Sequence, residues 1–116
     1  MQQPETVIRN AILTRLSALT YEGQRACVVW RRFVGRARAL TDPRIVLTIG
    51  TPGMADIGGF LSNGRALEIE VKTGTGRLSE EQKNWAKVCN TMGALHIVAR
   101  SPEEAEKAVL DAIASR

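Results

Sequence analysis

Side chains that commonly bind transition metals are scarce in this sequence, which holds one histidine and two cysteines among 116 residues. Cys27 and Cys89 lie far apart and show no metal-ligand spacing, so we expect two buried free thiols in a reducing compartment. His96 stands alone within an apolar stretch, where a packed or edge position in a strand is expected rather than a base or a metal ligand. A zinc centre and a disulfide-stapled fold are therefore not expected.

Long hydrophobic runs are also missing, and aromatic residues are scarce. No apolar stretch approaches the ~18 residues that span a bilayer, so we expect no membrane partner. The first turns carry Glu5 and Arg9 and lack the apolar core of a signal peptide, so we expect a cytoplasmic protein. Aromatic residues make up only 4% of the chain. Trp30 lies in a predicted strand, where a core position is favoured over stacking on a base.

The remaining composition is ordinary for one folded domain. Hydrophobic residues make up 44% and charged residues 24% of the chain. A chain of 116 residues can bury a core without disulfides, and neither repeats nor a low-complexity linker divide it. We therefore predict a single domain over residues 1–116.

Positive charge is concentrated in one segment, although the formal net charge is only +4. The segment 25–44 contains a single acidic residue, Asp42. Its arginines are Arg25, Arg31, Arg32, Arg36, Arg38 and Arg44. Such a cluster favours a phosphate-rich partner, with a solvated charged face as the alternative.

Hydrophobic periodicity and turn residues predict an α/β fold, in which helices flank a mixed sheet. The expected elements are a helix at 4–19, a strand at 26–34, a polar loop at 35–43, a strand at 44–49, a hairpin within 54–72, a helix at 79–92, a strand at 94–99 and a last helix from residue 101. The buried stripe of the second helix is expected to comprise Trp85, Val88, Cys89 and Met92.

The second strand of the hairpin carries the most informative pattern. Because side chains alternate between the faces of a strand, Glu70 and Lys72 share one face while Ile69 and Val71 enter the core. Asp56, on the partner strand, can be brought beside them. Two carboxylates and a lysine at a sheet edge can bind a divalent cation and position a water, as metal-dependent phosphodiester cleavage requires.

The turn of this hairpin decides whether the carboxylates meet. A two-residue turn at Asn63-Gly64 would direct Asp56 to the face opposite Glu70. A three-residue loop with Gly64 in the left-handed conformation would instead pair Asp56 with Glu70. A bulge at 58–59 would achieve the same correction. The site therefore requires one of these two departures from the simplest hairpin.

Several nearby residues have two interpretations. Gln82 lies three residues after the predicted N-cap, so it completes a capping box or faces the sheet near the site. Glu5 complements the dipole of the first helix, or it supplies a further acidic group. Glu68 shares the face of Glu70 but is expected to be solvated or to face DNA. The glycine-rich loop from Thr73 to Arg77 can approach phosphate through its amides, hydroxyls and arginine.

Taken together, these stretches resemble the VRR-NUC domain, the virus-type replication-repair nuclease branch of the PD-(D/E)xK superfamily. The resemblance covers most of the chain, from about Glu5 to the last helix, and implies a restriction-endonuclease-like core. Ala55 stands where the superfamily's name places a proline. The residues that carry the resemblance are Asp56-Ile57, Ile69 to Lys72, Gly76 to Gln82, Gly93-Ala94 and Val98 to Ser101.

The resemblance implies a role for each residue of the site. Asp56 and Glu70 would bind Mg²⁺ or Mn²⁺ with help from the backbone carbonyl of Val71. Lys72 would orient the attacking water and stabilise charge on the phosphate. Gln82 matches the glutamine that follows the lysine in this family, which favours a position in the site.

The resemblance also implies partners. Glu5 matches the glutamate of the family's first helix and would complete the metal shell. Small stand-alone domains of this kind look like homodimeric Holliday-junction resolvases of bacterial or phage-infected cells, so we expect a structure-selective DNA endonuclease that leaves 5′-phosphate ends. A flap or single-strand nicking nuclease, a restriction-type or RNA-directed nuclease, and an inactive DNA-binding or assembly subunit are the alternatives. The expected DNA contacts are Arg31, Arg32, Arg36, Arg38, Arg44, Thr73 and Arg77.

Overall fold

A four-stranded mixed sheet forms the centre of the protein in the computed structural model, which describes residues 3–115. Its strand order is β3 (Cys27–Arg31), β6 (Ile57–Leu61), β7 (Ala66–Val71) and β8 (Leu95–Ala99). The β3–β6 and β6–β7 pairs are antiparallel, whereas β7 and β8 run parallel. The predicted α/β class with a mixed sheet is confirmed.

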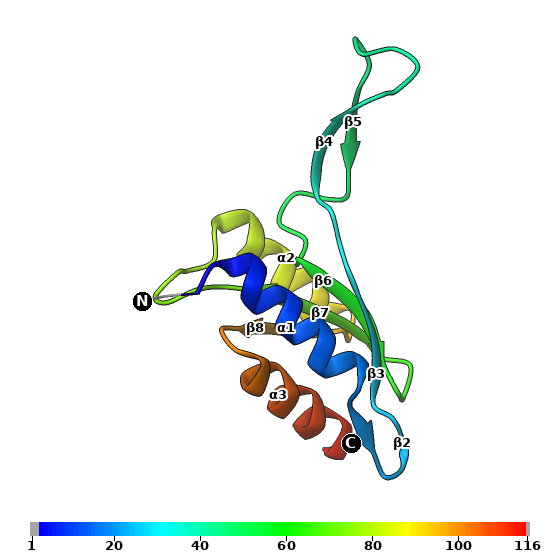
Figure 1. Cartoon of the computed structure of the whole chain (residues 1–116), viewed down its shortest axis with the longest axis vertical. Coiled ribbons are helices and arrows are strands. Elements are labelled where there is room, and N and C mark those ends of the chain that lie inside the picture. The colour runs from blue at the N-terminus through cyan, green and yellow to red at the C-terminus, as the bar shows by residue number, and fades with distance from the viewer. Residues whose placement is uncertain (1–2, 116) are drawn as a thin grey trace.

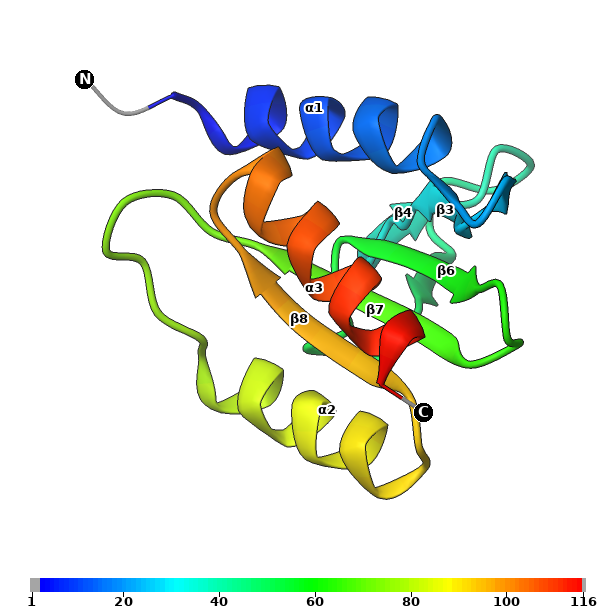
Figure 2. The same ribbon diagram turned by 90° about the horizontal axis from the view of Figure 1, so that it is seen from below.

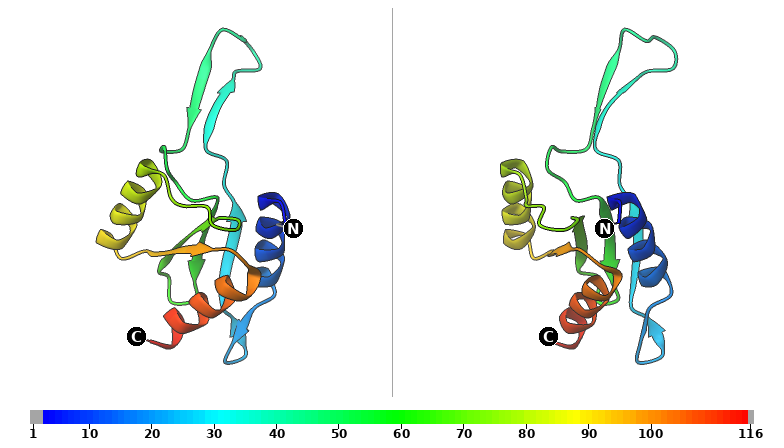
Figure 3. Two further views of the ribbon diagram at one scale, coloured as in Figure 1. Left: turned by 90° about the vertical axis from the view of Figure 1, so that its left-hand side faces the viewer. Right: turned by 60° about the vertical axis from the view of Figure 1, so that its left-hand side comes forward.

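The three helices divide between the two faces of this sheet. Figure 2 shows α1 (Glu5–Ser17) and α3 (Pro102–Ala114) on one side, and α2 (Glu80–Thr91) lies across the sheet from them in Figure 3. None of the helices within residues 3–115 is long and apolar enough to cross a membrane. The sheet is therefore enclosed by two helices on one face and by a single helix on the other.

The core fills the space between the sheet and the helix pair α1 and α3. Apolar residues of α1 recur at a spacing of four, which places them on one helical face, and alternate residues of β7 point toward them. The fully or almost fully buried residues of this core include Ile8, Ile12, Leu16, Ile57, Leu67, Ile69, Val71, Ala105, Val109 and Ile113. Even-numbered positions of β7 consequently face α2.

The β6–β7 hairpin has the register that the site requires. Ile57 pairs with Ile69, and the Leu61 amide donates to the Arg65 carbonyl at 2.8 Å. Gly64 has φ +87°, which is the left-handed conformation of a three-residue loop. The three-residue loop is confirmed, and continuing its register by one residue places Asp56 opposite Glu70.

A second hairpin projects from the body of the protein (Figure 1). It consists of β4 (Gly35–Arg38) and β5 (Val46–Ile49), and we call it the arm. The prediction of a loop throughout 35–43 is thus wrong for its first four residues, which pair with β5. One face of the arm carries Ala37, Leu47 and Ile49, and the other carries Arg36 and Arg38.

The sequence interpretation also missed a small hairpin between α1 and β3. Its strands, β1 (Thr20–Tyr21) and β2 (Gln24–Arg25), contain two residues each and are joined by a turn at Glu22-Gly23. Strands this short show no alternation that a periodicity argument can detect.

Candidate active site

The two predicted carboxylates meet at the edge of the sheet. Asp56 directly precedes β6, and its Oδ2 accepts a hydrogen bond of 3.0 Å from the backbone amide of Val71. Glu70 lies one residue before Val71 on β7 and is only 3% exposed. The Val71 amide therefore holds Asp56 against the strand that carries Glu70.

The environment of Glu70 strongly disfavours its negative charge. The pKa of Glu70 is raised to about 8, first because the group is buried and then because it lies beside Asp56. Glu5 adds a smaller effect in the same direction, whereas Lys72 opposes them. Asp56 and Lys72 therefore lie close enough to Glu70 to act on its charge, and Glu5 lies within electrostatic reach.

Gln82 fills both of the roles that its position suggested. Its side-chain Oε1 accepts a hydrogen bond from the Ser79 backbone amide at 2.9 Å, while the Gln82 backbone amide donates to Ser79 Oγ at 3.2 Å. Its Nε2 donates to Glu70 Oε1 at 3.0 Å. One side chain thus closes the capping box of α2 and joins that helix to the site.

The donor set fits a hard divalent cation. Glu70 Oε2 is buried and accepts no hydrogen bond from any group of residues 3–115, and its neighbour Asp56 is itself an acid, so a proton or a cation is what can join the two carboxyl groups. Mg²⁺ is commonly held by one or two carboxylates together with waters and substrate phosphates. No group of three His, Cys, Asp or Glu side chains within residues 3–115 is arranged to hold a metal. The structure thus places Asp56 and Glu70 together as two candidate ligands. It does not arrange Glu5 with them as a third ligand.

Comparison with known proteins identifies the family. The profile of the VRR-NUC domain matches residues 5–103. This chain belongs to the VRR-NUC domain family. No curated protein and no solved structure gives a match. The matched range includes every residue of the site, and the family is one of nuclease domains.

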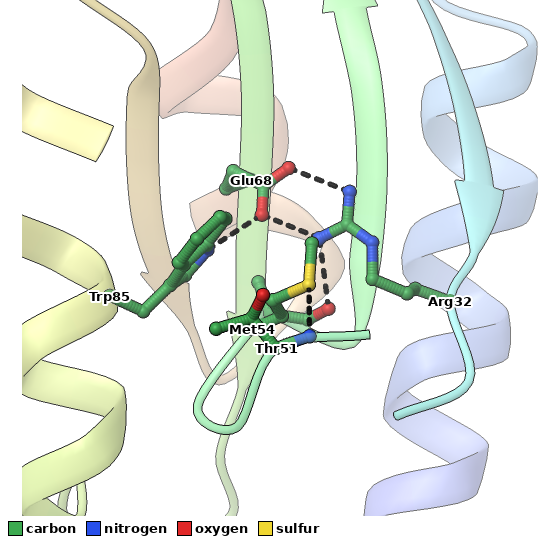
Figure 4. A network of polar contacts seen from close by, with 6 residues as sticks. Arg32, Thr51, Met54, Glu68 and Trp85 are labelled. Atoms are coloured by element: carbon green, nitrogen blue, oxygen red, sulfur yellow. Dashed lines mark hydrogen bonds and ion pairs between the residues drawn. The ribbon is translucent and has the colours of Figure 1, made fainter. Parts of the chain in front are cut away.

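A buried ion pair lies beside the site of this VRR-NUC domain (Figure 4). Arg32 Nη2 donates to Glu68 Oε2 at 2.8 Å, and Arg32 Nη1 contacts the other carboxylate oxygen. Trp85, on α2, donates its Nε1–H to Glu68 Oε1 at 2.8 Å. Glu68 is only 7% exposed, so the prediction of a solvated or DNA-facing carboxylate is wrong. The helix α2 covers it, and Arg32 supplies the opposite charge.

Arg32 also fastens the segment that carries Asp56. Its backbone amide donates to the Asp56 carbonyl at 2.7 Å, and its Nη1 donates to the Ala55 carbonyl at 3.3 Å. The guanidinium crosses β6 above Gly58, where a Cβ would lie 2.2 Å from Arg32 Nη2. Arg32 was predicted to contact DNA, but its guanidinium is held within the protein and is not available to grip phosphate.

The other predicted DNA contacts are divided between the arm, the end of β3 and the loop after β7. Arg31 ends β3, Arg36 and Arg38 lie on the arm, Arg44 lies near its tip, and Thr73 and Arg77 belong to the loop between β7 and α2. Arg44 hydrogen-bonds to Asp42, which lowers the pKa of that carboxyl. These positions are compatible with phosphate contact, which stays a prediction.

Three expected core residues are exposed. Trp30 is 42% exposed and meets the ring of Phe60 edge-on at 5.4 Å. Val88 of α2 and Met92, the residue directly after this helix, are 48% and 79% exposed, whereas Cys89 of α2 is buried. The predictions for Trp30, Val88 and Met92 are therefore wrong. Trp30 lies on the edge strand β3, which the single helix of this face leaves open, and Val88 and Met92 face solvent.

The predictions for the thiols and the histidine agree with the structure. Cys27 and Cys89 are free and buried. His96 is half-buried within β8, and burial lowers its pKa. None of the three belongs to the carboxylate site.

Proposed function

We propose that this VRR-NUC domain is a Mg²⁺- or Mn²⁺-dependent endodeoxyribonuclease that hydrolyses phosphodiester bonds. The observation that carries the proposal is the state of Glu70, a carboxyl group buried beside a second acid, Asp56, with one oxygen that has no partner within residues 3–115. A protein that only binds DNA gains nothing from two acids placed near a phosphate. A bound cation turns the same arrangement into a favourable one.

Each side chain of the site then has a distinct task. When bound between Asp56 and Glu70, the cation would neutralise charge on the phosphodiester and lower the pKa of a water. The Val71 amide orients the Asp56 carboxylate through its hydrogen bond to Oδ2. Gln82 binds Oε1 of Glu70, so that Oε2 would be left for the cation. Lys72 brings a positive charge to the face of Glu70, where it orients the attacking water and stabilises the transition state.

The basic arm supports a DNA substrate. Arg36 and Arg38 share one face of the arm, which carries them away from the body and gives them reach along a nucleic-acid backbone (Figure 1). Contacts of this kind bind phosphate without reading sequence, so the affinity falls steeply with salt. A nuclease that grips backbone alone selects its substrate by shape.

A four-way DNA junction and a homodimer complete the proposal. Two copies related by a two-fold axis present two sites to two strands, which matches the near-symmetry of a junction. The apolar face of the arm supports a partner subunit, since Leu47 and Ile49 are 46% and 39% exposed. Measurement of the mass in solution tests the dimer.

The activity is tested with labelled four-way, flap, single-stranded and duplex DNA in the presence of Mg²⁺ or Mn²⁺. We expect metal-dependent nicking, fastest on the junction, that Lys72→Ala abolishes while binding is retained. Lys87→Ala, at an exposed position of α2, is the matched control and should cut normally. Tight binding without cutting under either metal would refute the enzyme and favour an inactive DNA-binding or assembly subunit.

A further inference from the structure

An open cavity of about 630 Å³ lies next to the carboxylate site, on the side of β8. It is formed by the loop after β7, the first turn of α2 and the end of β8. The charged residues that line it, Arg77, Lys83 and Arg100, are all cationic. Three positive charges around one hollow suit an anion.

The strand register places this cavity beside the catalytic residues. Glu70 pairs with Val98 of β8, so Val98 lies on the same face of the sheet as Glu70. One step further along, the Lys72 amide donates to the Ala99 carbonyl at 3.1 Å, which sets Lys72 next to Arg100. Neighbouring strands are separated by about 4.8 Å, so the cavity and the site adjoin.

Arg100 is the residue of the cavity that most clearly lacks a partner. Its Nη1 is buried and makes no hydrogen bond within the described chain. Lys83 is engaged only by an exposed contact with Glu80 at 3.3 Å. A guanidinium presents a planar fork that matches two oxygens of a phosphate. A phosphate oxygen in the cavity would supply the bond that Arg100 is missing.

We infer that this cavity is a second phosphate site, which holds the backbone phosphodiester adjacent to the one that is cut. The inference rests on the proposed function and deepens it by giving the path of the bound DNA strand across the protein. That strand runs across the end of the sheet, from Asp56 on the β6 side, past Glu70 and Lys72 on β7, to Arg100 after β8. The Thr75 hydroxyl, also at the wall of the cavity, adds a donor for the same group.

Binding of a fluorescent dT₁₂ strand and of a four-way junction, measured by anisotropy in EDTA over a range of salt concentrations, tests this site without cleavage. We expect Arg100→Gln to weaken binding about tenfold and to reduce the slope of log affinity against log salt by about 0.7 on the single strand, as expected for one lost phosphate contact. Arg100→Lys should recover part of the affinity, because it keeps the charge but loses the fork.

A second variant protects the test against misfolding. Arg77→Gln combined with Lys83→Gln alters only exposed side chains and should reduce the slope by about 1.4, the value for two contacts. The control is Lys107→Gln, which removes one exposed cation of α3, on the face of the sheet opposite α2. It should leave both the affinity and the slope close to those of the wild type.

Cleavage assays on the same proteins separate this inference from the proposed function. If the wild type binds and cuts DNA while the cavity variants bind with unchanged affinity and slope, the second phosphate site is overturned and the nuclease stands. If binding depends on the cavity but no metal supports cutting, the phosphate site stands and the nuclease falls. If the wild type binds neither probe, both are overturned.

Discussion

Removal of Arg32 should destabilise this protein far more than the loss of an ordinary surface charge. The Arg32 and Glu68 side chains are only 17% and 9% exposed, so water cannot replace the missing partner. Breaking one side of a buried ion pair typically costs about 3–5 kcal/mol, because a charge is left buried and uncompensated. We expect Arg32→Met to lower the free energy of unfolding by that amount.

The double variant distinguishes an ion pair from simple packing. Glu68→Leu alone leaves the Arg32 guanidinium buried without its counter-ion and should also lower the free energy of unfolding by about 3–5 kcal/mol. Combining it with Arg32→Met removes both charges and leaves two neutral groups without these partners, the Trp85 indole N–H and the Ala55 carbonyl, at a cost of about 1–3 kcal/mol each. Independent effects would sum to about 6–10 kcal/mol, so the midpoints of these ranges give an expected coupling energy of about 4 kcal/mol.

Urea unfolding followed by tryptophan fluorescence measures these differences. The matched control is Lys107→Met, which breaks an ion pair with Asp111 whose side chains are 79% and 65% exposed. That variant should lose less than about 0.5 kcal/mol. The reasoning is refuted if Arg32→Met costs under about 1 kcal/mol, or if the two single losses add in the double variant.

Three further outcomes follow from the same face of the sheet. Because Glu70, with its pKa of about 8, holds a proton in the folded state that the unfolded chain has released, metal-free stability should fall as the pH rises from 5 to 8. The slope should approach about 1.4 kcal/mol per pH unit, and Glu70→Gln should flatten it in urea titrations. Mn²⁺ at 100 times its dissociation constant should stabilise the wild type by about 2.7 kcal/mol, and Asp56→Ala should lose this gain in thermal scans. Gly58→Ala should cost about 1–3 kcal/mol, because the new methyl displaces the Arg32 guanidinium, and an unchanged unfolding midpoint would contradict the close approach.

The site was predictable from the sequence because its geometry is local. Alternation along β7 separates Glu70 from Ile69, and Gly64 fixes the loop length that brings Asp56 opposite Glu70. Both rules operate within a single hairpin. The sequence left open a two-residue turn, a three-residue loop and a bulge, and the structure decided among them in favour of the three-residue loop.

The arm and the exposed tryptophan were mispredicted for the opposite reason. Gly35–Arg38 alternates in burial, but it consists of glycine, alanine and arginine and lacks the β-branched and aromatic residues that identify a strand from sequence. Trp30 lies in a strand of normal composition, but its exposure depends on how far α2 extends across the sheet. That extent is set by tertiary packing and leaves no mark in the local sequence.

Glu68 and Glu70 are residues of the same type on one strand, but they lie in two different electrostatic environments. Both lie on the face of β7 covered by α2, and both are almost fully buried. Glu68 has a permanent cation in Arg32, whereas the partner of Glu70 on α2 is the neutral amide of Gln82. A carboxylate with a fixed counter-ion stays charged in the folded protein, whereas one buried beside another acid is neutralised by a proton or by an exchangeable cation. Under the proposed function, a metal would be directed to Glu70 rather than to Glu68, because Arg32 already neutralises Glu68 whereas Gln82 brings no charge to Glu70.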